Sequence, residues 1–197
     1  MSDQLIAALT GTYGHPAAHT PHLDRLAAGG VRFDAAYTPF PLCAPGRACI
    51  ATGRHASEIG AWDNGALTAA DQVTHAHYLT NAGYDTVASG KLHFVGPDQL
   101  HGLNRRLTTD IYRADFGWVK PEWVRMKETQ GREYEQIMAD RTNYHTRGYV
   151  GDAIRVGAWH HHLAYDEESG FRANEYLRAW ACGDREQPFF LCASFHH

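Results

Sequence analysis

Hydrophobic and polar positions along the chain predict strands that alternate with helices. Residues 31–37 alternate apolar and polar side chains as a half-buried strand does, and residues 188–195 form the short apolar run of a buried strand. A further strand is expected over residues 84–89. A helix is expected from Asp166, as its N-cap, to Cys182. Its apolar side chains recur at helical spacing and predict one buried face, made of Ala173, Tyr176, Leu177, Trp180 and Ala181.

Residues with strong positional preferences indicate where two more helices begin and end. Thr20 suits an N-cap and Pro21 the first helical position, and a glycine closes that helix. The next helix is expected from Thr74 to Ala82, because Gly83 follows it. Helices that alternate with strands at this spacing indicate an α/β fold, in which helices flank a largely parallel sheet.

A third short helix brings a thiol and a guanidinium together. Pro45 suits its first turn, where no N–H is needed, and Gly53 suits the position just past its end. Cys43 then lies at the helix N-terminus, where free N–H groups and the helix dipole hold an anion or favour a thiolate. Arg47, one turn later, adds donors suited to a sulfate or phosphate. Taken alone, Cys43 also fits a small buried side chain.

Two other segments carry polar side chains that we expect at the same edge of the sheet. Asp3 and Gln4 offer hard oxygen donors for a divalent cation. Lys91 and His93 follow the strand expected over residues 84–89. In an extended segment their side chains, a cation and a titratable donor, would point to the same side. Because ligands of parallel sheets bind at the carboxyl ends of the strands, we expect Asp3, Cys43 and Lys91 to meet there.

Composition narrows the class of protein. The 197 residues are 44% hydrophobic and carry a formal net charge of −4, which fits one globular domain and argues against a disordered or nucleic-acid-binding chain. No apolar run approaches the roughly 20 residues that cross a bilayer, and residues 1–4 lack a signal pattern, so no membrane partner and a cytoplasmic location are expected. The four cysteines include no Cys-x-x-Cys pair, which indicates neither a zinc site nor a disulfide framework.

Residues 43–54 contain Cys-x-Pro-x-Arg followed by Thr-Gly-Arg, which resembles the sulfatase signature. In that family the cysteine is oxidised after synthesis to formylglycine, so the resemblance implies a formylglycine-generating enzyme as a partner. Sulfatases usually have serine where this chain has Gly46. The Gly-Lys-x-His element at Lys91 and His93 resembles the family too, as does the Ser-Phe-x-His that ends at His197. The implied fold is the alkaline-phosphatase-like α/β fold.

The resemblance also implies a catalytic mechanism. A divalent metal, calcium rather than magnesium or manganese, would be held by Asp3, Gln4 and the modified Cys43. One hydroxyl of the hydrated formylglycine would attack sulfur. The second hydroxyl would later expel sulfate and regenerate the aldehyde.

Four further side chains have roles by the same resemblance. Arg47 and Lys91 would stabilise the added charge. His197, or a group beyond it, would help the alcohol leave, and His93 would deprotonate the second hydroxyl.

A narrower resemblance concerns the substrate. Residues 62–64, 90–102, 106–112 and 115–118 look like choline sulfatases. This resemblance implies that Asn64 contacts the sulfate and that Trp118 forms part of the pocket for the trimethylammonium group. Choline-O-sulfate and related small alkyl or aryl sulfates are the implied substrates. A phosphonate monoester or phosphodiester hydrolase of the same superfamily remains an alternative, and a catalytically silent fragment or binding module is another.

The resemblance carries an expectation about domain organisation. Sulfatases have an apolar strand before the metal-binding Asp-Gln and a long portion after the Ser-Phe-x-His histidine. Residues 1–197 are therefore expected to be the N-terminal part of a sulfatase catalytic domain, incomplete at both ends. We expect this part alone to be inactive, and the full-length form to be capable of forming homo-oligomers.

Overall fold

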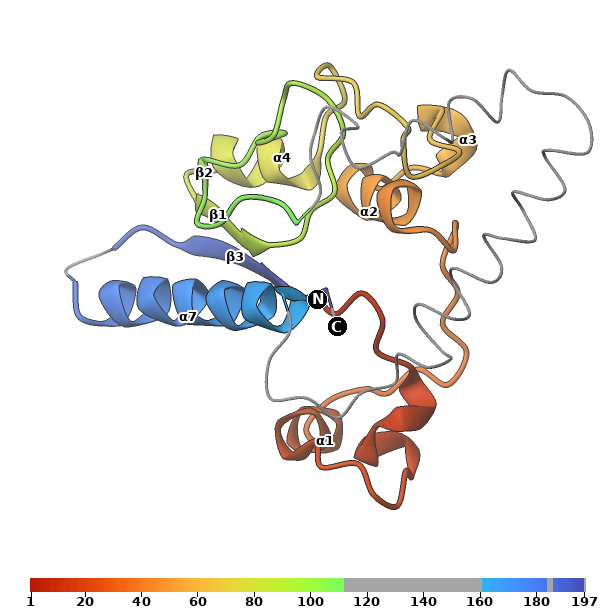
Figure 1. Cartoon of the computed structure of the whole chain (residues 1–197). Coiled ribbons are helices and arrows are strands. Elements are labelled where there is room, and N and C mark those ends of the chain that lie inside the picture. The colour runs from red at the N-terminus through yellow and green to blue at the C-terminus, as the bar shows by residue number, and fades with distance from the viewer. Residues whose placement is uncertain (112–160, 184–185, 197) are drawn as a thin grey trace, which may run out of the picture.

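The computed structural model describes residues 1–111, 161–183 and 186–196 (Figure 1). Two short 3₁₀ turns, Ala7–Leu9 and Gly11–Tyr13, precede the first α-helix. The helices are α1 (Pro21–Ala28), α2 (Cys43–Thr52), α3 (Ala56–Ile59), α4 (His75–Asn81) and α7 (His161–Ala181), and the strands are β1 (Asp85–Gly90), β2 (Arg105–Arg106) and β3 (Phe189–Ser194).

The three strands form one sheet in the order β2-β1-β3, and both pairs are parallel. In the longer pair, Val87 of β1 lies opposite Leu191 of β3. The N-terminus extends the same edge, because Ser2 forms a parallel bridge with Phe195 and the backbone N–H of Asp3 donates to the Phe195 carbonyl at 3.1 Å. These pairings confirm the expected α/β fold with a parallel sheet.

Helices cover both faces of the sheet, with α2 and α4 on one side and α7 on the other (Figure 1). The hydroxyl of Ser89 in β1 donates to the Ser169 carbonyl of α7 at 2.8 Å. Alternate residues of a strand face opposite sides, so the neighbouring Ala88 points towards α2 and α4. The main apolar cluster lies on that side and consists of Ala51, Ala76, Ala88, Leu92, Phe94 and Leu103.

The prediction of a strand at residues 31–37 is wrong. This segment has no regular secondary structure, and the side chains of Val31 and Phe33 are 76% and 69% exposed. It is held by isolated contacts, such as the Tyr13 hydroxyl that donates to the Phe33 carbonyl at 2.7 Å. An alternating pattern forms a strand only where a neighbour completes its backbone hydrogen bonds. No strand lies beside it in the described part of the chain.

The capping residues predicted helices α1, α2 and α4 well, whereas the short helix α3 was not predicted. Helix α1 follows Thr20 and begins at Pro21. Helix α4 follows Thr74, and α2 ends before Gly53, whose φ of 68° is the left-handed conformation that glycine adopts most easily.

Helix α7 begins earlier than expected, at His161 instead of just after Asp166. Asp166 is therefore an internal helical residue, and its carboxylate does not cap the helix. Oδ1 of Asp166 accepts a hydrogen bond from the backbone N–H of His196 at 2.6 Å. An Asp near an apolar stripe predicted a cap, but its partner lies 30 residues further along the chain.

The buried face of α7 is narrower than predicted. Ala173 and Tyr176 are 6% exposed and pack towards the sheet, whereas Leu177 is 38% exposed and Ala181 is also exposed. Trp180 is partly exposed, and its ring packs against that of Phe189 with the centroids 4.8 Å apart. A two-residue and a six-residue strand beside β1 cover less of a 21-residue helix than a wide sheet does. Within the described residues, no helix is both long and apolar enough to cross a membrane.

Candidate active site

Side chains from four segments meet at the carboxyl edge of the sheet. Lys91 directly follows β1, His196 lies two residues past β3, Asp3 is bound to the same edge, and Cys43 is the first residue of α2. The thiol of Cys43 donates to Oδ2 of Asp3 at 3.3 Å, and Nζ of Lys91 lies 3.4 Å from Sγ of Cys43. The structure thus confirms that Asp3, Cys43 and Lys91 converge at the expected edge.

Asp3 is the anionic centre of this cluster. Its Oδ2 accepts from Nζ of Lys91 at 2.5 Å, and its Oδ1 accepts from Nη2 of Arg47 at 2.9 Å. Burial favours the neutral acid, but the positive charges of Lys91 and Arg47 outweigh it and lower the pKa of Asp3 to about 2. Asp3 is consequently a carboxylate at every pH at which the protein is expected to function.

Lys91 links the cluster to a histidine. Its side chain is fully buried, and a buried ammonium group is stable only with compensating partners. Besides Asp3 and Cys43, Nζ of Lys91 lies 3.1 Å from Nδ1 of His196. One amine therefore touches the carboxylate, the thiol and an imidazole.

Cys43 is a thiol and not a thiolate, contrary to the prediction. Burial raises the pKa of Cys43, and the Asp3 carboxylate opposes the effect of Lys91. Two N–H groups of the first helical turn are also engaged. The N–H of Ala44 donates to Oδ1 of Asn64 at 3.0 Å, and that of Gly46 donates to the Leu42 carbonyl at 2.9 Å.

Asn64 therefore binds the first turn of α2 directly beside Cys43. The sequence predicted a contact between Asn64 and sulfate, and that role stays a prediction. Its position is compatible with it, because the amide binds the residue that follows Cys43.

Arg47 joins α2 to the ends of both long strands. Its side chain is buried, and Nη1 donates to Oγ of Ser194 at 2.8 Å and to the backbone carbonyl of Lys91. With the Asp3 contact, both Nη groups have protein acceptors. The structure therefore gives Arg47 a role in fixing Asp3 and Lys91, and its predicted role towards sulfate stays a prediction.

His93 lies near the cluster in an unexpected backbone conformation. The expectation of an extended segment is wrong here, because His93 has a φ of 57°. The residue is 3% exposed, and burial together with the charge of Lys91 lowers the pKa of His93 to about 4. The ring is thus neutral near pH 7.

Sequence reasoning missed His196. Its backbone is held by Asp166, and its ring packs edge-on against His162 with centroids 4.5 Å apart. A signal for it was available, because residues two apart on a strand point to the same side. Ser194 faces Arg47, so His196 shares its side of the extended chain, whereas His197 lies outside the described residues.

The remaining predicted residues are less well defined. Gln4 is exposed, and Trp118 lies outside the described residues. The described parts of the chain contain no group of three His, Cys, Asp or Glu side chains that could hold a metal ion. Asp3 has the right donor chemistry for calcium, but cations already contact both its oxygens, and calcium takes six to eight oxygen ligands. The described residues do not form a complete metal centre.

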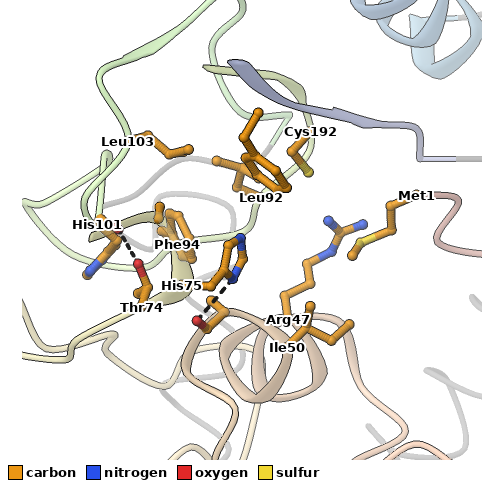
Figure 2. Close-up of a pocket in the computed structure, with 13 residues that line it drawn as sticks. Met1, Arg47, Ile50, Thr74, His75, Leu92, Phe94, His101, Leu103 and Cys192 are labelled. Atoms are coloured by element: carbon orange, nitrogen blue, oxygen red, sulfur yellow. Dashed lines mark hydrogen bonds between the residues drawn. The ribbon is translucent and has the colours of Figure 1, made fainter. Parts of the chain in front are cut away.

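A small apolar cavity lies near the cluster, between the sheet and helices α2 and α4 (Figure 2). Its volume is about 50 Å³, and Arg47 borders it together with side chains such as Ile50 and Phe94. Asp3, Cys43 and Lys91 do not line it. The cavity is therefore distinct from the point at which the reactive groups converge.

Comparison with known proteins places this arrangement in a family. The family model described as Sulfatase matches residues 1–197. A choline-sulfatase of Rhizobium meliloti (strain 1021) is 41% identical over 182 residues, which cover 91% of this chain and 33% of that protein. The uncharacterized sulfatase YidJ of Escherichia coli (strain K12) is 38% identical over 202 residues, covering 100% of this chain and 37% of that protein. The chain belongs to the sulfatase family.

Solved structures confirm the fold. The phosphonate monoester hydrolase of Agrobacterium radiobacter superposes with a TM-score of 0.62 at 21% identity, over 100% of this chain and 39% of that one. At this identity the likeness shows the α/β fold alone. The chain spans between 33% and 39% of the length of these three proteins.

Proposed function

We propose that this chain contributes to a sulfuric ester hydrolase that works through a formylglycine made from Cys43. The observation that supports this most strongly is the placement of Sγ of Cys43 within 3.4 Å of both a buried carboxylate and a buried ammonium group. Membership of the sulfatase family and the Cys-x-Pro-x-Arg signature support the same assignment.

The proposed chemistry assigns each side chain a task. A hydrated formylglycine at position 43 supplies one hydroxyl for attack on sulfur and a second whose deprotonation releases sulfate. Lys91 stabilises the negative charge that builds up on the sulfuryl oxygens, because a buried cation acts strongly where water is excluded. Arg47 holds Asp3 and Lys91 in place.

Proton transfer is the task of the histidines in this proposal. His93 is neutral and accepts a proton from the second hydroxyl. His196, which contacts Lys91, protonates the departing alcohol in this proposal, a task that the family resemblance implied for His197 or a group beyond it.

The proposed substrate is choline-O-sulfate or a related small alkyl or aryl sulfate. The 41% identity to a choline-sulfatase supports it, and so does Trp118, since an aromatic face attracts a quaternary ammonium group. Trp118→Ala should weaken turnover of choline sulfate far more than that of an uncharged aryl sulfate. Equal losses on both substrates would reject this role for Trp118.

A divalent cation, calcium before magnesium or manganese, is part of the proposal for the complete active site. Asp3 and Gln4 bring the oxygen donors that such ions prefer. The formylglycine-generating enzyme is the proposed protein partner.

A phosphonate monoester or phosphodiester hydrolase is the second candidate. The Asp3-Gln4 pair and the structural likeness to a phosphonate monoester hydrolase favour it, but that likeness extends to the fold alone. The sequence similarity to sulfatases is higher, so sulfate esters remain the first proposal.

One experiment separates these candidates. The complete product of the gene that encodes this chain is co-expressed with a formylglycine-generating enzyme, and the Cys43 peptide is analysed by mass spectrometry. Choline sulfate, an aryl sulfate and a phosphonate monoester are then assayed with calcium. Cys43→Ala should abolish sulfate release, whereas Cys49→Ala, on the same helix but outside the cluster, should retain it.

Either of two results would reject the proposal. The first is a Cys43 that stays an unmodified thiol. The second is faster turnover of the phosphonate than of both sulfates, which would favour the second candidate.

A further inference from the structure

The turn that follows β1 is bound to a carboxylate that the sequence did not single out. The backbone N–H groups of Leu92 and His93 both donate to Oδ2 of Asp110, at 2.9 and 2.7 Å. Two consecutive amides can converge on one oxygen only if the chain turns sharply between them. His93, whose N–H is the second of these donors, has a positive φ of 57°, and a residue with a Cβ adopts this conformation only when its surroundings hold it.

The carboxylate is itself held in place. Nη2 of Arg106 donates to the same Oδ2 of Asp110 at 3.0 Å and reaches the Gly90 carbonyl at 3.3 Å. The side chains of Asp110 and Arg106 are only 4% and 9% exposed. Burial opposes ionisation, but Arg106 and the two N–H groups lower the pKa of Asp110, so it stays charged.

The neighbouring residue adds to this support. The N–H of Gly90 donates to Oγ1 of Thr108 at 2.7 Å. Residues 106–110 thus contact the chain immediately before and after Lys91.

From this geometry we infer that Asp110 is a positioning residue for the proposed hydrolysis. It acts through the turn that carries Lys91 and His93, and fixes both the direction of the Lys91 amine towards Cys43 and the buried place of the His93 ring. The inference rests on the proposed function for its link to catalysis. Its structural part, the hold on the turn, can be tested independently of any activity.

The chain offers a matched control. Oδ1 of Asp98 also accepts two consecutive backbone N–H groups, those of Leu100 at 2.9 Å and His101 at 3.1 Å. His101 likewise has a positive φ, of 42°. Asp98 therefore makes the same kind of contact in a turn that carries no side chain of the cluster.

The test compares Asp110→Asn and Asp110→Ala with Asp98→Asn and Asp98→Ala in the complete gene product. We expect Asp110→Ala to lower kcat about 100-fold with a smaller change in KM, because a displacement of about 1 Å in a catalytic group costs this much. The Asp98 variants should keep kcat close to the wild-type value. Asp110→Asn retains one acceptor oxygen and should fall between wild type and Asp110→Ala.

Hydrogen exchange provides the readout that does not depend on activity. Mass spectrometry of short peptides covering residues 90–94 should show exchange about tenfold faster or more in Asp110→Asn, because a hydrogen bond to a charged acceptor is lost. The same peptides should be unchanged in Asp98→Asn. If Asp110→Ala does not fold, Asp110→Asn carries the comparison, because it has the same shape.

The outcomes are distinct. If no variant or wild type hydrolyses sulfate esters, the proposed function fails, while hydrogen exchange still decides whether Asp110 holds the turn. Unchanged exchange at residues 90–94 in Asp110→Asn overturns the inference. So does a loss of kcat that is equal in the Asp110 and Asp98 variants, because the effect would then be general destabilisation.

Discussion

Replacement of Asp3 by asparagine tests the central ion-pair cluster. Asparagine keeps the shape of the side chain but removes the charge that Lys91 and Arg47 both contact, at 2.5 and 2.9 Å. Two buried cations would then face a neutral amide. Removing one partner of a buried ion pair is strongly destabilising, because the other charge is left without compensation.

The size of the effect follows from the pKa of Asp3. Its ordinary value is 3.8 and its value in the folded chain is about 2, a difference worth about 2 kcal/mol of stability. Because the folded pKa is the lower one, this contribution is complete above pH 3.8 and is lost as the pH falls through 2. We expect Asp3→Asn to lower the free energy of unfolding by about 2–4 kcal/mol at pH 7. The upper figure is a typical cost of removing one partner of a buried ion pair.

Urea unfolding followed by circular dichroism measures this loss. The control is Asp34→Asn, because Asp34 pairs with Arg32 at 2.9 Å on the surface and its side chain is 71% exposed. That change should cost less than about 1 kcal/mol. The difference between wild type and Asp3→Asn should shrink by about half at pH 3. The reasoning is refuted if both variants lose the same stability, or if the loss is independent of pH.

Three further predictions concern other parts of the site. The pKa of His93 is lowered from 6.5 to about 4. As the pH falls, this residue therefore binds a proton at a higher pH in the unfolded chain than in the folded chain. His93 should therefore lower the stability by up to about 3 kcal/mol between pH 6.5 and 4, and His93→Gln should make that slope shallower in urea titrations, with the part due to the lowered pKa of His101 remaining. Gly90→Ala should prevent folding, as judged by circular dichroism, because its Cβ would lie 1.8 Å from the Ser194 carbonyl oxygen. Gly46→Ser should raise conversion of Cys43 to formylglycine, measured by mass spectrometry; no increase would mean that Gly46 does not limit the modification.

Much of the fold could be predicted because its signals are local. Pro45 and Gly53 bracket α2 through their own backbone preferences, and Thr74 does the same for the start of α4. The strand at 31–37 failed for the opposite reason. Alternation describes the side chains of one segment, whereas a strand also needs a partner, which a single segment does not encode.

The site shows the same division. Cys43 and Lys91 were predictable because each follows from a motif at the end of a local element. Asp110 and Asp166 were not, because each binds backbone N–H groups that lie 17 to 30 residues away. The thiol state of Cys43 was also unpredictable, since burial and the Asp3 carboxylate decide it and neither is visible in the helix that carries the cysteine.

The unequal charges of the cluster give Asp3→Asn a second, opposite effect. In the wild type, two cations share one carboxylate, whereas Asp110 is paired with Arg106 and Asp166 accepts from a backbone N–H. We expect an anion such as a sulfate ester to bind near Lys91 and Arg47, the two cations that contact Asp3. Without the carboxylate, the same cations attract an anion more strongly. Calorimetric titration with inorganic sulfate should therefore show tighter binding to Asp3→Asn than to wild type, although the variant is less stable. Weaker binding to the variant would show that Asp3, and not the two cations, organises the anion site.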